Sequence, residues 1–204
     1  MTSCADGFKL QGELDQFSLE AALVNLGRVL EERGLAYDLV TIGGSSLMLL
    51  GLLQRPTRDL DVVAVVEGQH YVKVRELPGP LQRAVEEIGQ VLNIGSNWLN
   101  LGPADLMDFG LPEGFSDRTE VRKYGPLTLH VAGRTDQIAL KLYASADQGV
   151  QSKHFQDLQM LRATHEELIN AARWTTTHDP SEGFRGELIV ILVALGVLDA
   201  SSLI

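Results

Sequence analysis

The sequence is poor in cysteine, in positive charge and in long hydrophobic runs. Cys4 is the single cysteine among 204 residues, which excludes an internal disulfide framework and favours a reducing compartment. Lys and Arg number 17 against 27 Asp and Glu, so a net charge of −10 disfavours broad, sequence-independent binding to nucleic acid. No basic-then-apolar signal opens the chain, and the longest late apolar run, 188–198, is too short to cross a bilayer. We therefore expect a cytoplasmic protein without a membrane partner.

The length and the hydrophobic content allow a substantial core. Hydrophobic residues make up 45% of the chain, which suits one globular unit with a helical extension. The chain has no repeats, no low-complexity tract and no linker long enough to separate independent domains. We expect an N-terminal tail over 1–17, a mixed core over 18–134 and a helical part over 135–204 that packs on this core.

Hydrophobic periodicity predicts an α+β protein with a small mixed sheet, flanking helices and a C-terminal helical part. Ser18 is expected to cap the first helix, Thr164 to form a capping box with Glu167, and Ser181 to cap the last helix. The segment 93–120, rich in Gly, Pro and Asn, is expected to be ordered loop with short helix or strand pieces. The predicted strands are 37–42, 59–66, 120–124 and 127–131, and the predicted helices are 18–34, 47–53, 81–92, 136–145, 153–163, 165–174 and 181–195.

The most informative segment is 41–66, TIGGSSLMLLGLLQRPTRDLDVVAVV. Its two aspartates, Asp59 and Asp61, are separated by Leu60 alone, and side chains two apart on a strand share a face. Both carboxylates therefore point to one place, while Leu60 and Val62 turn into the core. An Asp at a strand start is often only a turn residue, but two ionised groups on one strand face repel each other and are costly to desolvate. The pair favours a metal site.

A glycine turn precedes this strand and predicts a phosphate site. Gly43 and Gly44 let the backbone turn sharply and approach a ligand closely. Ser45 or Ser46 could cap the helix that follows, whose free N–H groups and positive dipole end attract phosphate. Arg58 could fork onto phosphate oxygens, or it could pair with the adjacent aspartates. Mg²⁺ prefers a few carboxylates plus substrate phosphates, which this arrangement supplies.

The glycine turn and the Asp-Leu-Asp strand resemble the signature of the DNA polymerase beta-like nucleotidyltransferase superfamily. Much of 20–196 also resembles a bacterial family of uncharacterised nucleotidyltransferase-like proteins, and the chain is distantly similar to the nucleotidyltransferase toxins of abortive-infection toxin–antitoxin systems. The segments that carry these resemblances are GLLQRPTRDLDVV, NWLNLGP, GLPEGF, KLYASADQG, SKHFQDLQML and HDPSEGF.

The resemblance implies roles for three further residues. The superfamily commonly places a third metal-binding acid on a later strand, where this chain offers His130 instead. Histidine is a poor Mg²⁺ ligand, so His130 could act as a base, accept Mn²⁺ or simply face the surface. In the similar toxins a lysine such as Lys141 faces the active site, so here it could neutralise triphosphate charge; alternatively it is a solvated helix residue. Asp157 matches an acid thought to activate the acceptor, although a surface ion pair with Lys153 is the plainer interpretation.

These observations predict a Mg²⁺-dependent nucleotidyltransferase, with Mn²⁺ as a possible substitute. It would move a nucleoside monophosphate from a nucleoside triphosphate to a hydroxyl of RNA, of a protein or of a small molecule, and it could be the toxin of a pair with an antitoxin partner. The missing third acid motivates an alternative, a nucleotide-binding or interaction module that kept the fold and lost turnover. A basic patch suited to an RNA acceptor could form from Arg118, Arg122, Lys123 and Arg134, unless these are merely solvated.

Overall fold

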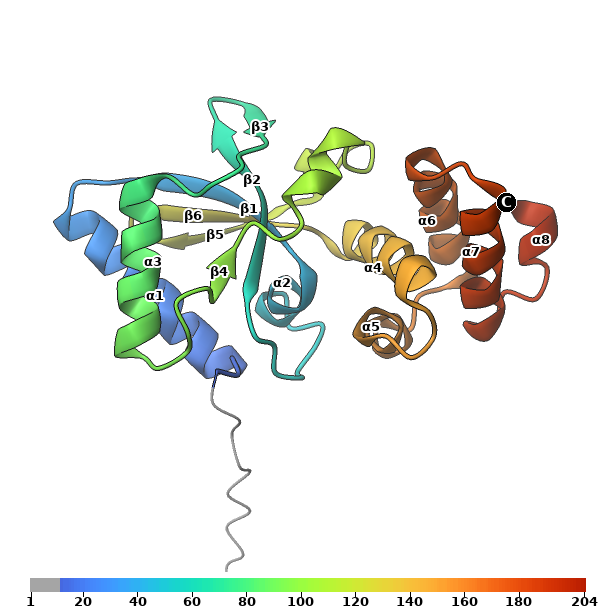
Figure 1. The fold of residues 1–204 in the computed structure, drawn as a ribbon, viewed down its shortest axis with the longest axis horizontal. Coiled ribbons are helices and arrows are strands. Elements are labelled where there is room, and N and C mark those ends of the chain that lie inside the picture. Colours follow the sequence, from blue (N-terminus) through green and yellow to red (C-terminus); the bar gives the residue numbers. More distant parts are fainter. Residues whose placement is uncertain (1–11) are drawn as a thin grey trace, which may run out of the picture.

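A computed structural model describes residues 12–204, so Cys4 lies outside the described part of the chain. Helices and strands follow one another closely along these residues (Figure 1). In chain order the elements are α1 (Gln16–Glu32), β1 (Tyr37–Ile42), α2 (Gly43–Leu49), β2 (Leu60–Glu67), β3 (His70–Val72), α3 (Gly79–Val91), β4 (Leu99–Asn100), the 3₁₀ helices η1 (Ala104–Asp108) and η2 (Ser116–Arg118), β5 (Glu120–Tyr124), β6 (Leu127–Val131), α4 (Arg134–Gln148), α5 (Lys153–Leu161), α6 (His165–His178), α7 (Glu182–Ala194) and α8 (Ala200–Leu203).

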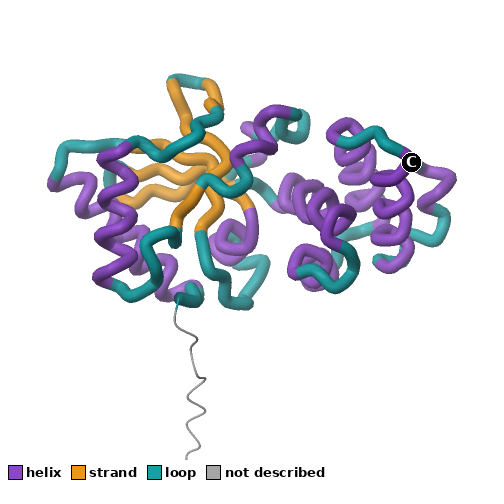
Figure 2. Tube along the Cα trace, in the orientation of Figure 1, coloured by secondary structure: helices purple, strands orange, loops and turns teal. Residues whose placement is uncertain are grey.

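One half of the molecule is built on a mixed sheet and the other half is helical (Figure 2). The sheet has the order β3-β2-β1-β6-β5, and the short β4 pairs with β2. The central strand β1 runs antiparallel to β2 and parallel to β6. The predicted fold class, a mixed sheet with flanking helices and a helical C-terminal part, is confirmed.

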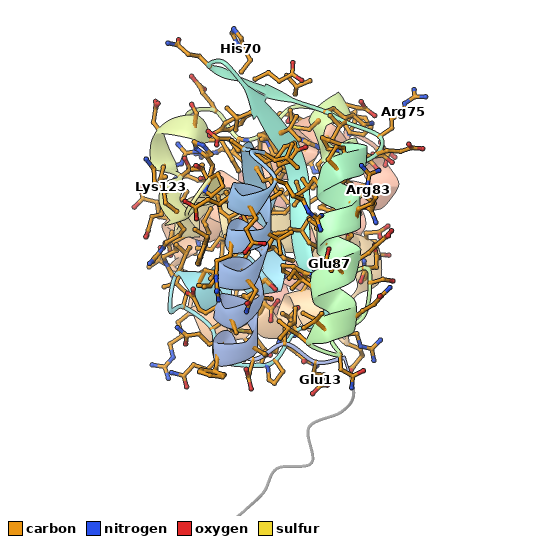
Figure 3. All side chains as sticks on the ribbon, turned by 90° about the vertical axis from the view of Figure 1, so that its left-hand side faces the viewer. Glu13, His70, Arg75, Arg83, Glu87 and Lys123 are labelled. Atoms are coloured by element: carbon orange, nitrogen blue, oxygen red, sulfur yellow. The ribbon has the colours of Figure 1, made fainter. Side chains whose placement is uncertain are left out.

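Helices α1 and α3 lie side by side on one face of the sheet (Figure 3). Their apolar faces cover buried leucines and valines of β1, β2 and β6, which form the largest hydrophobic cluster of the described residues. The cap of α1 is Asp15, and the prediction that Ser18 caps this helix is wrong. The side chain of Asp15 accepts a hydrogen bond from the N–H of Ser18 at 2.8 Å, and the hydroxyl of Ser18 accepts one from the N–H of Asp15 at 2.9 Å, which is a reciprocal capping box. Leu14 is buried and pairs with Thr57, so the described end of the predicted tail packs on the core.

The helix α2 begins earlier than predicted. Gly43 has φ +85°, which turns the chain directly from β1 into the helix without a side-chain cap. Ser45 and Ser46 therefore lie inside the helix, and the prediction that one of them caps it is wrong. Both are buried.

The C-terminal helices share a hydrophobic core with α2. Leu47, in the second half of α2, and Leu53, shortly after it, belong to the same cluster as buried residues of α4, α5, α6 and α7. The predicted capping box of Thr164 and Glu167 is confirmed, and so is the cap of Ser181 on α7. Within residues 12–204, none of the helices combines the length and the apolar character that a bilayer-crossing segment needs.

Candidate active site

A pocket of about 320 Å³ lies between the sheet and the helical part. Its sheet side is formed by the glycine turn that joins β1 to α2 and by the start of β2, and its other side by α4, α5 and the η1 region. Asp59 and Asp61 both line it, as do Gly43 and Gly44. The spacing of the sequence predicted this meeting of two carboxylates with a glycine turn, and the structure brings the four residues together.

The carboxylate of Asp61 lies directly against Gly43. A Cβ added at Gly43 would stand 2.5 Å from Oδ2 of Asp61, closer than side-chain carbons approach an oxygen. The strand register agrees, since Asp61 is the partner of Ile42, the residue before the turn. Glycine at this position therefore makes room for the carboxylate as well as for the turn.

The backbone of Asp59 is held by two hydroxyl groups. Ser45 Oγ donates to the carbonyl oxygen of Asp59, and Thr57 Oγ1 donates to the same oxygen at 3.4 Å. The bond from Ser45 ties the end of the α2–β2 connection to α2, and the two bonds together fix where the Asp59 side chain enters the pocket. The hydroxyl of Ser45 is buried in this contact, and Ser46 Oγ is buried without a hydrogen-bond partner.

Burial and mutual repulsion outweigh the nearby positive charge at the two carboxylates. Burial, and then repulsion from Asp59, raises the pKa of Asp61 from 3.8 to about 6, although Lys153 and Lys141 oppose the shift. A bound cation would stabilise the ionised form of both carboxylates and so oppose the rise in the pKa of Asp61. Carboxylate oxygens are also ligands that Mg²⁺ prefers. Within residues 12–204 no group of three or more His, Cys, Asp or Glu side chains forms a closed metal cage. The residues present fit a Mg²⁺ ion that also takes oxygen ligands from a substrate.

Beside the pocket, Asp157 joins two cations from different parts of the fold. Arg55, in the α2–β2 connection, donates through Nε at 2.7 Å and through a terminal nitrogen at 2.9 Å, and Lys141 Nζ of α4 lies 2.7 Å from Asp157 Oδ2. The Asp157 side chain is 0% exposed, and burial alone would raise its pKa; the hydrogen bonds from Arg55 and the charge of Lys141 lower it instead. Lys141 lines the pocket and Asp157 does not. Both are buried, unlike the solvated lysine and the surface ion pair considered from sequence.

Like Ser45, Ser46 and Asp157, the predicted residues Arg58 and His130 do not line the pocket. Arg58 is exposed and is absent from the lining. His130 lies level with Val40 on β1, whereas Asp61 lies level with Ile42, so the histidine falls two residues short of the carboxylates. Its Nε2 is 3.9 Å from Asp38 Oδ2, and its ring packs edge-on against Tyr71.

Sequence reasoning missed several residues of the lining, of which three are placed to contact a ligand or the glycine turn. Gln137 of α4 accepts a hydrogen bond from the N–H of Gly43 at 3.1 Å, and Lys153 and His154 of α5 complete the far wall. Burial, followed by the charges of Lys141 and Lys153, lowers the pKa of His154 to about 4, so its imidazole is neutral near pH 7. The available signal was weak: Lys153 and His154 open a helix directly after its cap, Ser152, but only the tertiary fold turns them toward Asp61.

The predicted basic patch is largely neutralised within the protein. Arg118 binds both oxygens of the buried Asp136, at 2.6 and 3.0 Å, and Arg134 binds Glu167 at 3.1 Å. Lys123 is exposed on β5. The structure therefore gives no support to a continuous basic surface there.

Two neighbouring carboxylates therefore lie beside a glycine turn in one pocket, which Lys141 also lines. The family model described as "Nucleotidyltransferase of unknown function (DUF6036)" matches residues 20–160, and the chain belongs to this family. The matched range contains the glycine turn, both aspartates and the charged groups around Asp157. No curated protein and no solved structure gives a significant match.

Proposed function

We propose that the protein is a Mg²⁺-dependent nucleotidyltransferase that moves a nucleoside monophosphate from a nucleoside triphosphate to an acceptor hydroxyl. One observation carries the proposal: the carboxylate of Asp61 is seated against Gly43, in the same pocket as Asp59 and Gly44. Two carboxylates beside a backbone turn that a ligand can approach closely suit a metal-bound triphosphate. The family membership supports the same class of reaction.

The pocket offers a place for each part of the substrate. Asp59 and Asp61 would hold Mg²⁺, which when bound neutralises phosphate charge. The backbone of the glycine turn faces the phosphates. Pro103, Leu106 and Leu140 add an apolar wall that suits the sugar and the base.

The lining residues also suggest how the acceptor hydroxyl is handled. Its oxygen forms a bond to the α-phosphorus while the bond from that phosphorus to the bridging oxygen breaks, and pyrophosphate leaves. His154 also lines the pocket, but its lowered pKa makes it a weak base, so the hydroxyl proton passes to solvent. The contacts of Asp157 favour a different role from proton acceptor: it holds Lys141 in place beside the carboxylates.

Transfer of label from α-³²P nucleoside triphosphates tests the proposal, with total RNA, cell lysate and small hydroxyl compounds as acceptors. We expect transfer that requires Mg²⁺ and that falls by at least about 100-fold in Asp59→Ala and Asp61→Ala. Asp38→Ala is the matched control, because this partly exposed aspartate lies next to His130 and away from the pocket. Equal transfer by Asp61→Ala and Asp38→Ala would contradict the assignment.

One observation favours a second candidate, a nucleotide-binding module without turnover. Directly after β6 the chain reaches the level of Asp61 at Ala132, whose N–H donates to the carbonyl of Thr41, and a buried alanine supplies no metal ligand. A module of this kind would bind Mg²⁺ and a triphosphate in calorimetry and would transfer no label to any acceptor. Transfer above background would exclude it.

The finer biological role that we propose is that of a toxin with an antitoxin partner, acting on RNA or on a protein. Its support is the likeness of the charged residues Lys141 and Asp157, in consecutive helices, to those of the abortive-infection toxins. Induced expression should then stop growth, and Asp59→Ala should restore it. Growth unaffected by the wild-type protein would favour a small-molecule acceptor.

A further inference from the structure

The pocket contains one cation that has no carboxylate partner. Lys141 is paired with Asp157, whereas Lys153, the other lysine of the lining, makes no ion pair with any residue of 12–204. Lys153 is the first residue of α5 and is exposed. Its ammonium is nevertheless close enough to Asp61 to lower that residue's pKa.

The other cation of the lining, Lys141, is held by Asp157, which it shares with Arg55, and no further group of the lining is positively charged near pH 7. The hydroxyl of Ser45 is used by the Asp59 carbonyl, that of Ser46 is buried inside α2, and Arg58 lies outside the lining. His154 is neutral near pH 7. A triphosphate carries several negative charges, and a metal ion between two carboxylates compensates for only part of them.

The position of Lys153 indicates which phosphates it meets. Asp61 lies deep, against Gly43, so the phosphorus that reacts is expected there, while the exposed Lys153 stands at the rim of the α5 side. The apolar residues Pro103 and Leu106 belong to the η1 region, where the sugar and base fit. Phosphates that extend away from the sugar therefore run toward α5.

We propose that Lys153 binds the β- and γ-phosphates of the nucleoside triphosphate and thereby selects triphosphates over monophosphates. This inference rests on the proposed function, and it assigns to a single side chain the recognition of the leaving pyrophosphate. A lysine suits this task, because its compact charge follows a flexible polyphosphate without fixed geometry.

The test compares the binding of non-hydrolysable nucleoside triphosphates and of the corresponding monophosphates, measured by calorimetry with Mg²⁺. Lys153→Met should weaken triphosphate binding by about 10- to 30-fold, the worth of one charge-assisted contact, and monophosphate binding by less than about threefold. Lys153→Arg should stay within about threefold of the wild type for both. Lys123→Met, a change of the same kind on the remote edge strand β5 (Figure 3), should have no effect.

Two results would overturn the assignment of Lys153: an equal loss for both ligands, or no loss for the triphosphates. If either result occurs while the wild-type protein still binds triphosphate and transfers label, the proposed function stands and only the role of Lys153 is refuted. If the wild-type protein binds none of the four triphosphates, both proposals fail together. Because Lys153 is exposed, its replacement is expected to leave the thermal unfolding temperature unchanged.

Discussion

Replacing Gly43 by alanine should disable the site by moving one carboxylate. The new Cβ would stand 2.5 Å from Asp61 Oδ2, whereas ordinary contacts begin at 3.4 Å, so the carboxylate has to withdraw by about 1 Å. A shift of this size in a reacting group can cost about 100-fold in rate. The positive φ of Gly43 adds a backbone strain of about 1–2 kcal/mol in the variant.

The chain offers a control that separates strain from contact. Gly51 has φ +70°, and a Cβ there would meet nothing within 4 Å, so Gly51→Ala carries a similar strain without touching the pocket. Gly51→Ala should lose about 1–2 kcal/mol of unfolding free energy in urea, and Gly43→Ala should lose at least as much. Only Gly43→Ala should lose Mn²⁺ affinity in calorimetry, by about tenfold or more, and label transfer by about 100-fold. If the two variants bind metal and transfer label equally, the contact between Gly43 and Asp61 has no functional meaning.

Three further predictions concern charge and packing. Because the pKa of Asp61 is raised from 3.8 to about 6, the folded state binds more protons than the unfolded state between these two pH values, and the unfolding free energy falls as pH rises through this window. Asp61→Asn should therefore stabilise the metal-free protein at pH 8 by up to about 3 kcal/mol and leave its stability unchanged at pH 3. Urea titrations at the two pH values check this prediction. Asp157→Asn leaves Arg55 and Lys141 without their buried counter-charge and should lower the unfolding free energy by about 3–5 kcal/mol. A loss below about 1 kcal/mol would show that Asp157 does not hold these two cations together. Trp98→Phe removes a buried indole that donates to a carbonyl of α3 at 2.9 Å and should lower the unfolding free energy by about 1–3 kcal/mol in the same assay.

Local chemistry made the sheet predictable. The strands β1, β5 and β6 have the predicted bounds, since each is a short run rich in β-branched, aromatic or leucine residues that ends at a glycine or proline turn. The start of α2 differs from the prediction because two glycines are typical of a turn before a helix, whereas here the positive φ of Gly43 makes the turn within a single residue. The alternation of side chains along a strand was enough to place Asp59 and Asp61 together.

The far wall of the pocket was not predictable in the same way. Gln137, Lys153 and His154 line the same pocket as the glycine turn because α4 packs against α2 and α5 packs against α4. This packing depends on apolar contacts between residues roughly a hundred positions apart. The arginines show the same limit. Arg118 and Arg134 looked like surface charges in the sequence, but each is held by an acid contributed by a helix that follows it.

The cluster that joins Leu47 and Leu53 to the C-terminal helices has a consequence for how the protein can be dissected. A truncated version that stops before α4 would expose these two leucines to solvent. It would also remove Asp157, the ion-pair partner of Arg55, and the side of the pocket formed by α4 and α5. Residue 134 is therefore a poor place to cut, and the two halves are expected to melt in one cooperative transition.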